Sequence, residues 1–344
     1  MVDFPDIDPA LLPADGRFGC GPSKVRTDQL EALFAPLLMG TSHRAAPVRR
    51  VVADLKEGLR ALLNVPDGYE VVLGNGGASA FWDAACACLI SSRAAFGSWG
   101  AFGAKFAASA KRAPHLASPL IDEARAGSLV TLAPRDPEQG VDAYAYPHNE
   151  TSTGVASPVY RVDAPGALTL VDGTSIAGAA PIDLTQVDAY YFSLQKALGS
   201  DGGLWVAILS PAAIERARRI EASPGGRWIP PFLSLSAAID NSRKDQTLNT
   251  PAVATIIMAQ RQVAWLNERG GIYWAWRNSG AQGAPTTDEE NLGGGIAKQE
   301  FSGRRTFVWS AKTGTHLLRT GGAFYYRFLE HRNAWGAPAT DETV

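Results

Sequence analysis

The chain has 344 residues, of which 46% are hydrophobic and 19% charged, and its formal net charge is −2. This balance excludes the basic surface of a nucleic-acid-binding protein, and no apolar run is long enough to span a membrane. The acidic start lacks the basic segment of a signal peptide, so we expect a cytoplasmic protein. The three cysteines, Cys20, Cys86 and Cys88, fit neither a disulfide framework nor a metal site.

Strands and helices alternate along most of the chain. Residues 1–16 are expected to form a loose lead-in, and apolar residues then recur at helical spacing over roughly 45–64. Further helices are expected from the Gly-rich turn at 74–79 to about 90 and at 100–111, 211–221 and 251–268, the last closed by Arg269-Gly270-Gly271. The expected strands are 69–73, 94–97, 128–132, 142–146, 167–172, 189–193 and 203–209. This pattern predicts a mostly parallel sheet covered by helices on both faces, in one large α/β domain over 17–270.

The character of the sequence changes after Gly271. The segment 271–344 contains Gly293-Gly294-Gly295 and scattered tryptophans, and it shows little sustained periodicity. Only 307–309 and 323–329 are expected to form regular elements. We expect either a smaller C-terminal α+β domain or an irregular, divergent tail.

Two of the buried strands end in residues that can carry chemistry. The strand 189–193 leads to Lys196 at a Gly-lined turn, and the strand 167–172 ends in Asp172. Ligands of open α/β sheets bind beyond the carboxyl ends of the strands. A lysine amine and a carboxylate at that edge suggest pyridoxal phosphate, bound as a Schiff base with its pyridine nitrogen against the carboxylate. A lysine in this position is about as often structural as functional, and the alternative interpretation of Asp172 is a turn or cap residue.

Other turns at the same edge offer groups for a phosphate and a flat ring. Gly76-Gly77-Ala78-Ser79 opens a helix whose free amides suit a phosphate, although the motif alone is weak. Phe102, at the next turn, is placed to stack on a heteroaromatic ring, although most such aromatics belong to the core. In Ser42-His43-Arg44, the arginine suits a substrate carboxylate and the histidine a second anion.

These motifs occur together and in the same order in one known family. They are Phe18-Gly19-Cys20-Gly21-Pro22-Ser23, Thr41-Ser42-His43-Arg44, Gly76-Gly77-Ala78-Ser79, Trp99–Phe106, Asn149-Glu150-Thr151, Val171-Asp172-Gly173-Thr174-Ser175, Ser193-Leu194-Gln195-Lys196 and Leu248-Asn249-Thr250-Pro251. With them the chain resembles the phosphoserine aminotransferases, class V enzymes of pyridoxal-phosphate fold-type I, and looks like their actinobacterial branch. The resemblance covers about residues 17–270, and nothing after Gly271 resembles the small domain that ends family members.

The resemblance implies roles for single residues. It implies that Lys196 is the catalytic Schiff-base lysine, that Asp172 pairs with the pyridine nitrogen and that Phe102 stacks on the ring. The other implied cofactor contacts are Ala78, Ser79 and Gln195 at the phosphate, Thr151 at the ring, and Asn249 and Thr250 at the phosphate held by the neighbouring subunit. Arg44 is implied to bind the substrate α-carboxylate, and His43 to lie beside the substrate phosphate.

The resemblance also implies an activity and an assembly. It implies a homodimer with shared active sites that transfers the amino group of glutamate to 3-phosphohydroxypyruvate, giving phosphoserine and 2-oxoglutarate in serine biosynthesis. Two alternatives stay open. One is another class V aminotransferase acting on alanine, serine or glyoxylate, against which Ser42-His43-Arg44 argues because such substrates carry no phosphate. The other is an inactive protein of the same fold, for which the unfamiliar C-terminal segment argues. A displaced reading frame, a truncation or a divergent domain would each explain that segment.

Overall fold

The computed structural model describes residues 16–17, 19–34, 38–223, 225–278, 290–301, 304–310 and 312–339, so the expected lead-in lies almost wholly outside the described residues. A seven-stranded sheet forms its centre, in the order β1-β9-β8-β7-β4-β2-β3. Its strands are β1 (Glu70–Asn75), β2 (Arg93–Ser98), β3 (Leu120–Glu123), β4 (Val141–Pro147), β7 (Leu168–Asp172), β8 (Ala189–Ser193) and β9 (Leu204–Leu209). β9 runs antiparallel to both its neighbours, β1 and β8, and the other neighbouring pairs of this sheet are parallel. The mostly parallel sheet is confirmed.

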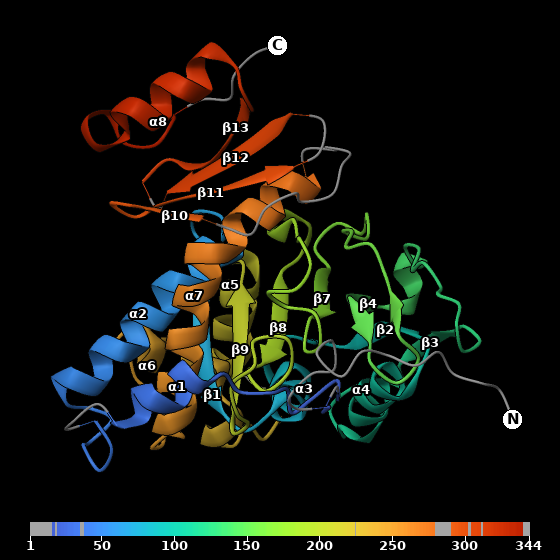
Figure 1. The fold of residues 1–344 in the computed structure, drawn as a ribbon. Coiled ribbons are helices and arrows are strands. Elements are labelled where there is room, and N and C mark those ends of the chain that lie inside the picture. The colour runs from blue at the N-terminus through green and yellow to red at the C-terminus, as the bar shows by residue number, and fades with distance from the viewer. Residues whose placement is uncertain are drawn as a thin grey trace, which may run out of the picture.

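Helices cover both faces of this sheet and bury a separate apolar core on each (Figure 1). One core is formed largely by α3 (Ala78–Cys88), α4 (Ala101–Arg112), α5 (Pro211–Ala222) and α6 (Leu235–Ser242), and the other by α2 (Ala46–Leu62) and α7 (Val253–Asn278). The short helix α1 (Thr27–Glu31) packs on α7. Single 3-10 turns lie at Ala32–Phe34, Pro137–Gln139, Leu184–Gln186 and Pro231–Leu233, and β5 (Asn149–Glu150) pairs with β6 (Val155–Ala156).

The strands at the middle of the sheet are apolar on both faces because helices cover both. Every residue of β7, β8 and β9 is buried, including three consecutive aromatic residues of β8, Tyr190, Tyr191 and Phe192. Phe81 of α3 stacks on Tyr191 with ring centroids 4.5 Å apart. This packing makes the strand that leads to Lys196 a rigid element.

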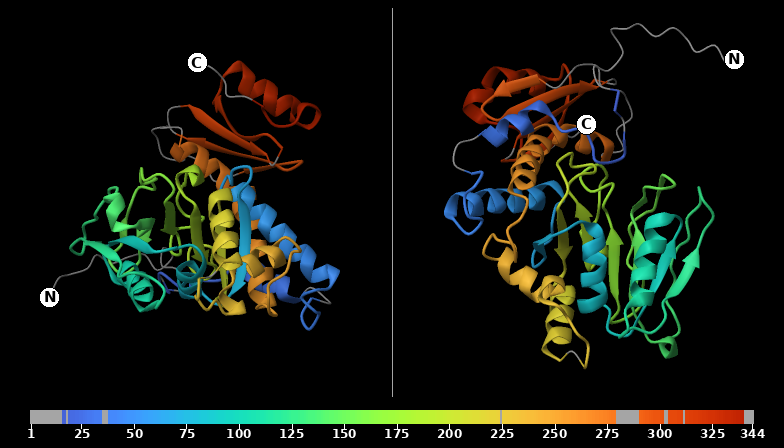
Figure 2. Two further views of the ribbon diagram at one scale, coloured as in Figure 1. Left: turned by 180° about the vertical axis from the view of Figure 1, so that it is seen from behind. Right: turned by 90° about the horizontal axis from the view of Figure 1, so that it is seen from below.

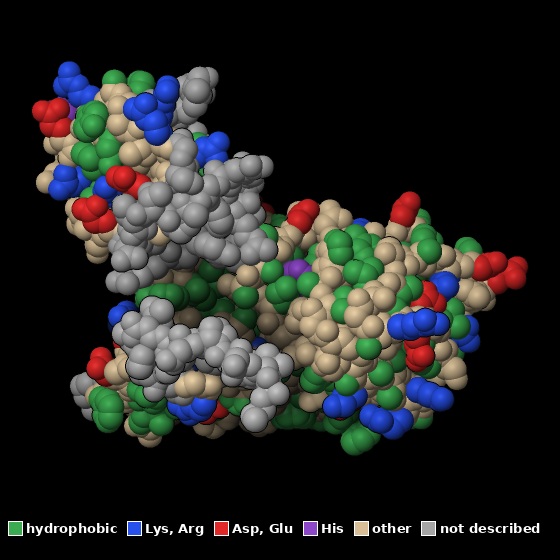
Figure 3. All heavy atoms as spheres, turned by 45° about the vertical axis from the view of Figure 1, so that its right-hand side comes forward, with side chains coloured by type: hydrophobic (Ala, Val, Ile, Leu, Met, Phe, Trp, Pro, Cys, Tyr) green, Lys and Arg blue, Asp and Glu red, His purple; other side chains and the backbone are tan. Residues whose placement is uncertain are grey.

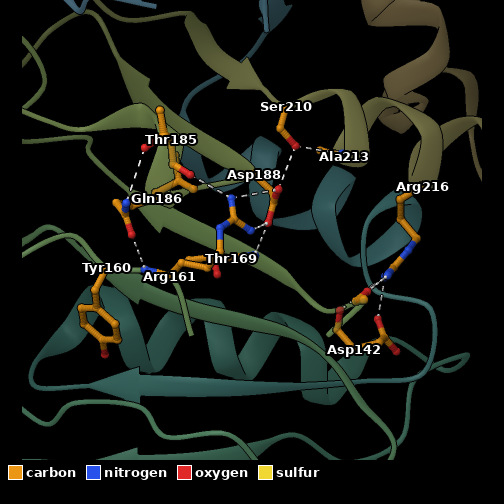
Figure 4. Close-up of polar contacts among 12 residues, drawn as sticks. Asp142, Tyr160, Arg161, Thr169, Thr185, Gln186, Asp188, Ser210, Ala213 and Arg216 are labelled. Atoms are coloured by element: carbon orange, nitrogen blue, oxygen red, sulfur yellow. Dashed lines mark hydrogen bonds and ion pairs between the residues drawn. The ribbon is translucent and has the colours of Figure 1, made fainter. Parts of the chain in front are cut away.

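A polar network fixes the amino ends of β7 and β8 (Figure 4). Asp188 is 3% exposed and accepts hydrogen bonds from the Thr169 amide (2.9 Å) and the Ser210 hydroxyl (2.9 Å). It also pairs with Arg161 at 2.6 Å. Nearby, Arg216 of α5 pairs with Asp142 of β4 at 3.0 Å. These contacts join β4, β7 and the start of β8 to helix α5, at the ends of the strands opposite to Lys196.

A second, smaller domain follows α7. It is an antiparallel sheet of β10 (Glu290–Gly293), β11 (Ile296–Phe301), β12 (Arg305–Ser310) and β13 (Gly314–Arg319), with α8 (Ala323–Trp335) packed on one face. The expected fold class, a large α/β domain with a smaller C-terminal α+β domain, is confirmed. Figures 2 and 3 show the C-terminal domain as a separate lobe beside one end of the large domain.

The long helix α7 explains where that lobe lies. Just before α7, the Thr250 carbonyl accepts from the Asn75 amide at the carboxyl end of β1. Further along, the Asn267 side chain donates to the Gly58 carbonyl in α2. The 26 residues of α7 span about 39 Å, and β11, β12 and β13 pack against it. The C-terminal domain therefore lies at the end of the sheet remote from Lys196.

Two predicted elements are wrong. The strand expected at 128–132 is absent, and β3 at the sheet edge is Leu120–Glu123, whose alternating burial suits an edge strand. Residues 128–132 instead form an irregular segment, in which the Leu132 amide donates to the Tyr160 hydroxyl at 2.7 Å. The helix expected at 251–268, which is α7, does not end at Arg269-Gly270-Gly271 but continues to Asn278. Within the described residues, no helix is long and apolar enough to cross a lipid bilayer.

Candidate active site

The segments that follow β1, β2, β4, β7 and β8 bring seven of the predicted site residues around one cavity. The cavity has a volume of about 160 Å³. The predicted residues that line it are Ala78, Ser79, Phe102, Thr151, Asp172, Gln195 and Lys196, and the further lining residues are Gly77, Trp82, Asn149, Thr174 and Ser193. Segments more than a hundred residues apart in the sequence thus meet at one point, as the parallel sheet requires.

Lys196 projects from the turn after β8 and is covered by the N-terminal segment. A Cβ atom on Gly21 would lie 2.3 Å from Cδ of Lys196, so only glycine leaves room for the lysine stem. The Ser23 amide donates to the Gln195 carbonyl at 2.8 Å and fastens this cover. The Lys196 amine lies 5.7 Å from the centre of the Phe102 ring, on the cavity side. One amine is therefore held at a fixed place in the cavity wall.

Asp172 ends β7 as a buried carboxylate. It accepts a hydrogen bond from the Thr174 amide at 2.8 Å, and burial raises its pKa above the ordinary value of an aspartate. Its neighbour Tyr191 accepts from the Trp82 indole at 3.0 Å. A buried carboxylate of this kind is stabilised by a cationic partner in the cavity. A protonated ring nitrogen is such a partner.

The first turn of α3 forms the anion-binding end of the cavity. The helix starts at Ala78, and the first amides of a helix have no partner within it. The Ala78 amide donates to the Ser193 hydroxyl at 2.8 Å. Oε1 of Gln195 is buried there without a hydrogen-bond partner. Amides, hydroxyls and the helix dipole at this end suit a phosphate group.

The other four predicted residues lie together around a second cavity of about 670 Å³. Its lining includes His43, Arg44, Asn249 and Thr250 but not Lys196. Nδ1 of His43 lies 3.3 Å from the Thr250 hydroxyl, while its Nε2 is buried without a partner. Burial, aided by the charge of Arg44, lowers the pKa of His43. Within one chain, then, these residues share a site with each other and not with Lys196.

Sequence reasoning assigned no role to several residues that shape the site. Gly21 and Glu150 stood inside recognised motifs, but Gly21 contacts Lys196 and Glu150 contacts Phe102 and Gly103, which are far away in the sequence. Trp82, Thr174 and Ser193 line the cavity, and each stands within four residues of a predicted site residue. Their position at strand ends and in the first turn of a helix was the one available signal.

Comparison with known proteins identifies the class and then the family. The sequence model of the aminotransferase class-V family matches residues 133–282. The putative phosphoserine aminotransferase of Mycolicibacterium vanbaalenii is 52% identical over 282 residues, covering 81% of this chain and 74% of that protein. The phosphoserine aminotransferase of a Nocardioides species is 53% identical over 277 residues, covering 79% and 73%. The chain belongs to the class-V aminotransferases. Within them it belongs to the phosphoserine aminotransferase family.

Solved structures show the same fold. A phosphoserine aminotransferase from Cytophaga hutchinsonii matches with a TM-score of 0.64 and 24% identity, over 76% of this chain and 75% of that one. The corresponding enzyme from Bacillus circulans matches with a TM-score of 0.61 and 21% identity, over 83% of each chain. A second sequence model, that of the LGFP repeat, matches residues 283–337. Most of the segment after Gly271, where the character of the sequence changes, thus matches a different sequence family.

The cofactor of the family is pyridoxal phosphate, and a solved relative from Trichomonas vaginalis is described as bound to it. The residues of the Lys196 cavity fit this group. The buried Asp172 faces a cavity that would hold a cation, the Gln195 side-chain amide lines the same space with an N–H group that can donate, and α3 directs its amino end into it. Phe102 forms an apolar wall for a flat ring.

Proposed function

We propose that this protein is a phosphoserine aminotransferase of serine biosynthesis, acting in the cytoplasm. It takes the amino group from glutamate and then passes it to 3-phosphohydroxypyruvate. The observation that carries the proposal is the single cavity in which the Lys196 amine, the Asp172 carboxylate and the amino end of α3 meet. The relatives, which are about half identical over most of the chain, bear the same name.

Each residue of the cavity has a distinct proposed task. Lys196 anchors the cofactor covalently and, once released by the incoming amino acid, moves a proton to and from the substrate Cα. Asp172 keeps the ring nitrogen protonated through charge pairing. Ala78, Ser79 and Gln195 hold the phosphate, while Phe102 and Thr151 fix the ring. The cofactor, when bound, supplies an electron sink for the pair left on Cα.

We further propose that the active protein is a homodimer with shared sites. The support is that Asn249, Thr250, His43 and Arg44 form a cavity apart from Lys196 of the same chain. In a symmetric dimer, Asn249 and Thr250 would complete the phosphate site of the partner, and Arg44 and His43 would bind the substrate carboxylate and phosphate.

Mixed dimers test this arrangement. A Lys196→Ala chain and a chain carrying Asn249→Ala and Thr250→Ala are each expected to be inactive alone. Refolded together, they would form hybrid dimers in which one of the two sites is intact, and activity would return in part. No recovery, despite mixed dimers seen by native mass spectrometry, would contradict shared sites.

The substrate proposal is tested with two keto acids that differ only by a phosphate. After glutamate has converted the bound cofactor to its amino form, we expect 3-phosphohydroxypyruvate to react at least about a hundredfold more efficiently than 3-hydroxypyruvate. Arg44→Ala would weaken both reactions, whereas His43→Ala would weaken mainly the first. Equal efficiencies would instead favour an aminotransferase for unphosphorylated substrates.

A second candidate function is cofactor binding without turnover. It is favoured by one observation: the segment that follows the class-V match belongs to the LGFP repeat, and its domain lies remote from Lys196. The two candidates differ in the reaction with glutamate. If the protein binds pyridoxal phosphate but does not react with glutamate, its function is cofactor binding without turnover.

A further inference from the structure

Glu150 is a buried carboxylate that touches the walls of the Lys196 cavity without lining it. The side chain is 0% exposed, and it stands directly before Thr151 in the chain. Its Oε2 accepts hydrogen bonds from the amides of Phe102 and Gly103, both at 3.0 Å. Its Oε1 accepts from the amide (3.1 Å) and the hydroxyl (2.7 Å) of Ser152. All four donors thus come from two segments that are about fifty residues apart.

The carboxylate joins two walls of the cavity. Phe102 stands in the first turn of α4, and Thr151 stands between Glu150 and its partner Ser152; both line the cavity. The Ser152 hydroxyl in turn accepts from the Ala101 amide at 2.8 Å. Gly100 makes the approach possible, since a Cβ atom there would lie 2.4 Å from Cγ of Glu150. A shift of Glu150 would therefore move both walls.

The burial of this charge has a physical reason. A carboxylate without solvent is costly unless hydrogen bonds and a favourable dipole compensate it. Glu150 receives four hydrogen bonds, two of them from amides at the amino end of α4, where negative charge is stabilised. An uncharged residue at this site would cap the helix only partly. The full set of contacts fixes the first turn of α4 in one orientation.

We propose that Glu150 is a positioning residue that holds the Phe102 ring and Thr151 against the bound cofactor. The proposal rests on the proposed function, because it assumes that Phe102 stacks on the pyridine ring. Glu150 itself does not touch the cofactor. Its effect reaches the cofactor through the orientation of Phe102.

The test uses Glu150→Gln in the full chain. The amide keeps the shape of the side chain, but in either orientation its N–H group faces a backbone N–H donor, either that of Ser152 or those of Phe102 and Gly103. The link between the two walls of the cavity is therefore weakened. We expect about tenfold weaker binding of pyridoxal phosphate. We also expect a changed visible circular dichroism signal from the bound cofactor, because the ring loses its fixed stacking partner. Ser152→Ala, which removes one of the four donors, is expected to give the same changes to a smaller extent.

A matched control separates positioning from simple stability. Ser234 caps α6, where its hydroxyl accepts from the Ala237 amide at 2.9 Å, and it does not line the cavity. Ser234→Ala is expected to lower the melting temperature while leaving cofactor affinity and circular dichroism unchanged. If Glu150→Gln gives only the same loss of stability, the proposal is overturned.

A double-mutant cycle with Phe102→Leu decides whether Glu150 acts through the ring. If it does, Glu150→Gln has little further effect on cofactor affinity once the ring is absent. Full additivity of the two effects would contradict the proposal. The cycle can also be made with Ser152→Ala, should Glu150→Gln not fold. Wild-type protein that fails to bind pyridoxal phosphate would instead refute the proposed function, on which this proposal depends.

Discussion

The two domains each hold a lysine among polar groups, and the two lysines have opposite surroundings. Lys298 in the C-terminal domain lies 3.1 Å from both Glu290 and Glu300 and 3.2 Å from the Tyr325 hydroxyl. Burial alone would lower its pKa, but the hydrogen bonds from Lys298 to Glu300, Tyr325 and Glu290 raise it. Lys196 in the large domain forms no ion pair with any residue that the structure describes, and it borders a cavity.

This difference shows what separates a structural lysine from one available for chemistry. The charge of Lys298 is neutralised by its neighbours, so its amine stays protonated and fixed in the sheet. The carboxylate near Lys196, Asp172, lines the same cavity from another strand and is free to pair with a bound cation. The Lys196 cavity therefore presents groups to a ligand, whereas Lys298 and its partners satisfy one another.

The largest expected effect comes from replacing each lysine in turn, which tests whether only Lys196 takes part in the reaction. Lys196→Ala is expected to reduce the reaction with glutamate at least about a thousandfold, because the proton at Cα loses its acceptor. Lys298→Ala, measured in the same stopped-flow assay, is expected to leave that rate unchanged. Similar losses in both variants would contradict the division between the domains.

Replacing Asp172 is expected to give the next largest effect: it lowers activity but stabilises the cofactor-free protein. Asp172→Asn is expected to slow glutamate turnover about a hundredfold or more, because the ring nitrogen loses its charged partner. In the cofactor-free protein the buried carboxylate has a raised pKa, so its ionisation disfavours the folded state.

The stability of cofactor-free Asp172→Asn should therefore depend on pH. Below the ordinary aspartate pKa of 3.8, variant and wild type carry no charge at this site and differ little. As the pH rises above that value, the wild type loses stability relative to the variant, until the raised folded-state pKa is passed. Melting temperatures over this range would show the widening gap; a constant difference would argue against a buried, ionisable Asp172.

A smaller effect on the Lys196 cavity is expected from substitutions in the Asp188 network, which lies at the amino ends of β7 and β8. Asp188→Asn is expected to reduce the free energy of unfolding by about 2 kcal/mol, since a buried acceptor of the Arg161 and Thr169 contacts is weakened. Asp240→Asn breaks a half-exposed pair with Arg218 and should cost less than about 1 kcal/mol. Urea denaturation measures both. Cofactor affinity should change in neither variant.

The smallest effect on the Lys196 cavity is expected from damage to the C-terminal core. Val308 is 0% exposed within that core, so Val308→Asp should unfold the C-terminal domain. Limited proteolysis would show cleavage after α7, while the absorbance of the bound cofactor would stay as in the wild type. Loss of cofactor binding in this variant would show that the two domains depend on each other.

The sequence predicted the large domain well because its elements are long and strongly patterned. In a buried strand such as β8 or an amphipathic helix such as α2, the pattern of apolar residues along the chain predicts both the element and the face that it buries. The strand expected at 128–132 shows the limit of this reasoning: three of its five residues are apolar, yet the Leu132 amide donates to the Tyr160 hydroxyl and not to a strand of the sheet. The C-terminal sheet was missed because its strands mix polar and apolar residues without a clear period, as in β11, where Lys298, Gln299 and Glu300 follow one another.

The candidate site was predicted to the extent that its residues follow strands. Lys196 and Asp172 could be paired because parallel strands end at one edge. The separate cavity of His43 and Thr250 could not be predicted, since it depends on how α7 begins beside β1. Glu150 was missed for the same reason: its partners become neighbours only when α4 is in place.

The central claim is that Lys196 of the large domain binds the cofactor covalently. Borohydride reduction of protein loaded with pyridoxal phosphate, followed by peptide mass spectrometry, tests it directly. We predict loss of the visible absorbance and a reduced pyridoxyl group on the peptide that contains Lys196, with none on Lys105 or Lys298. A label on another lysine, or a protein that stays unlabelled, would contradict the claim.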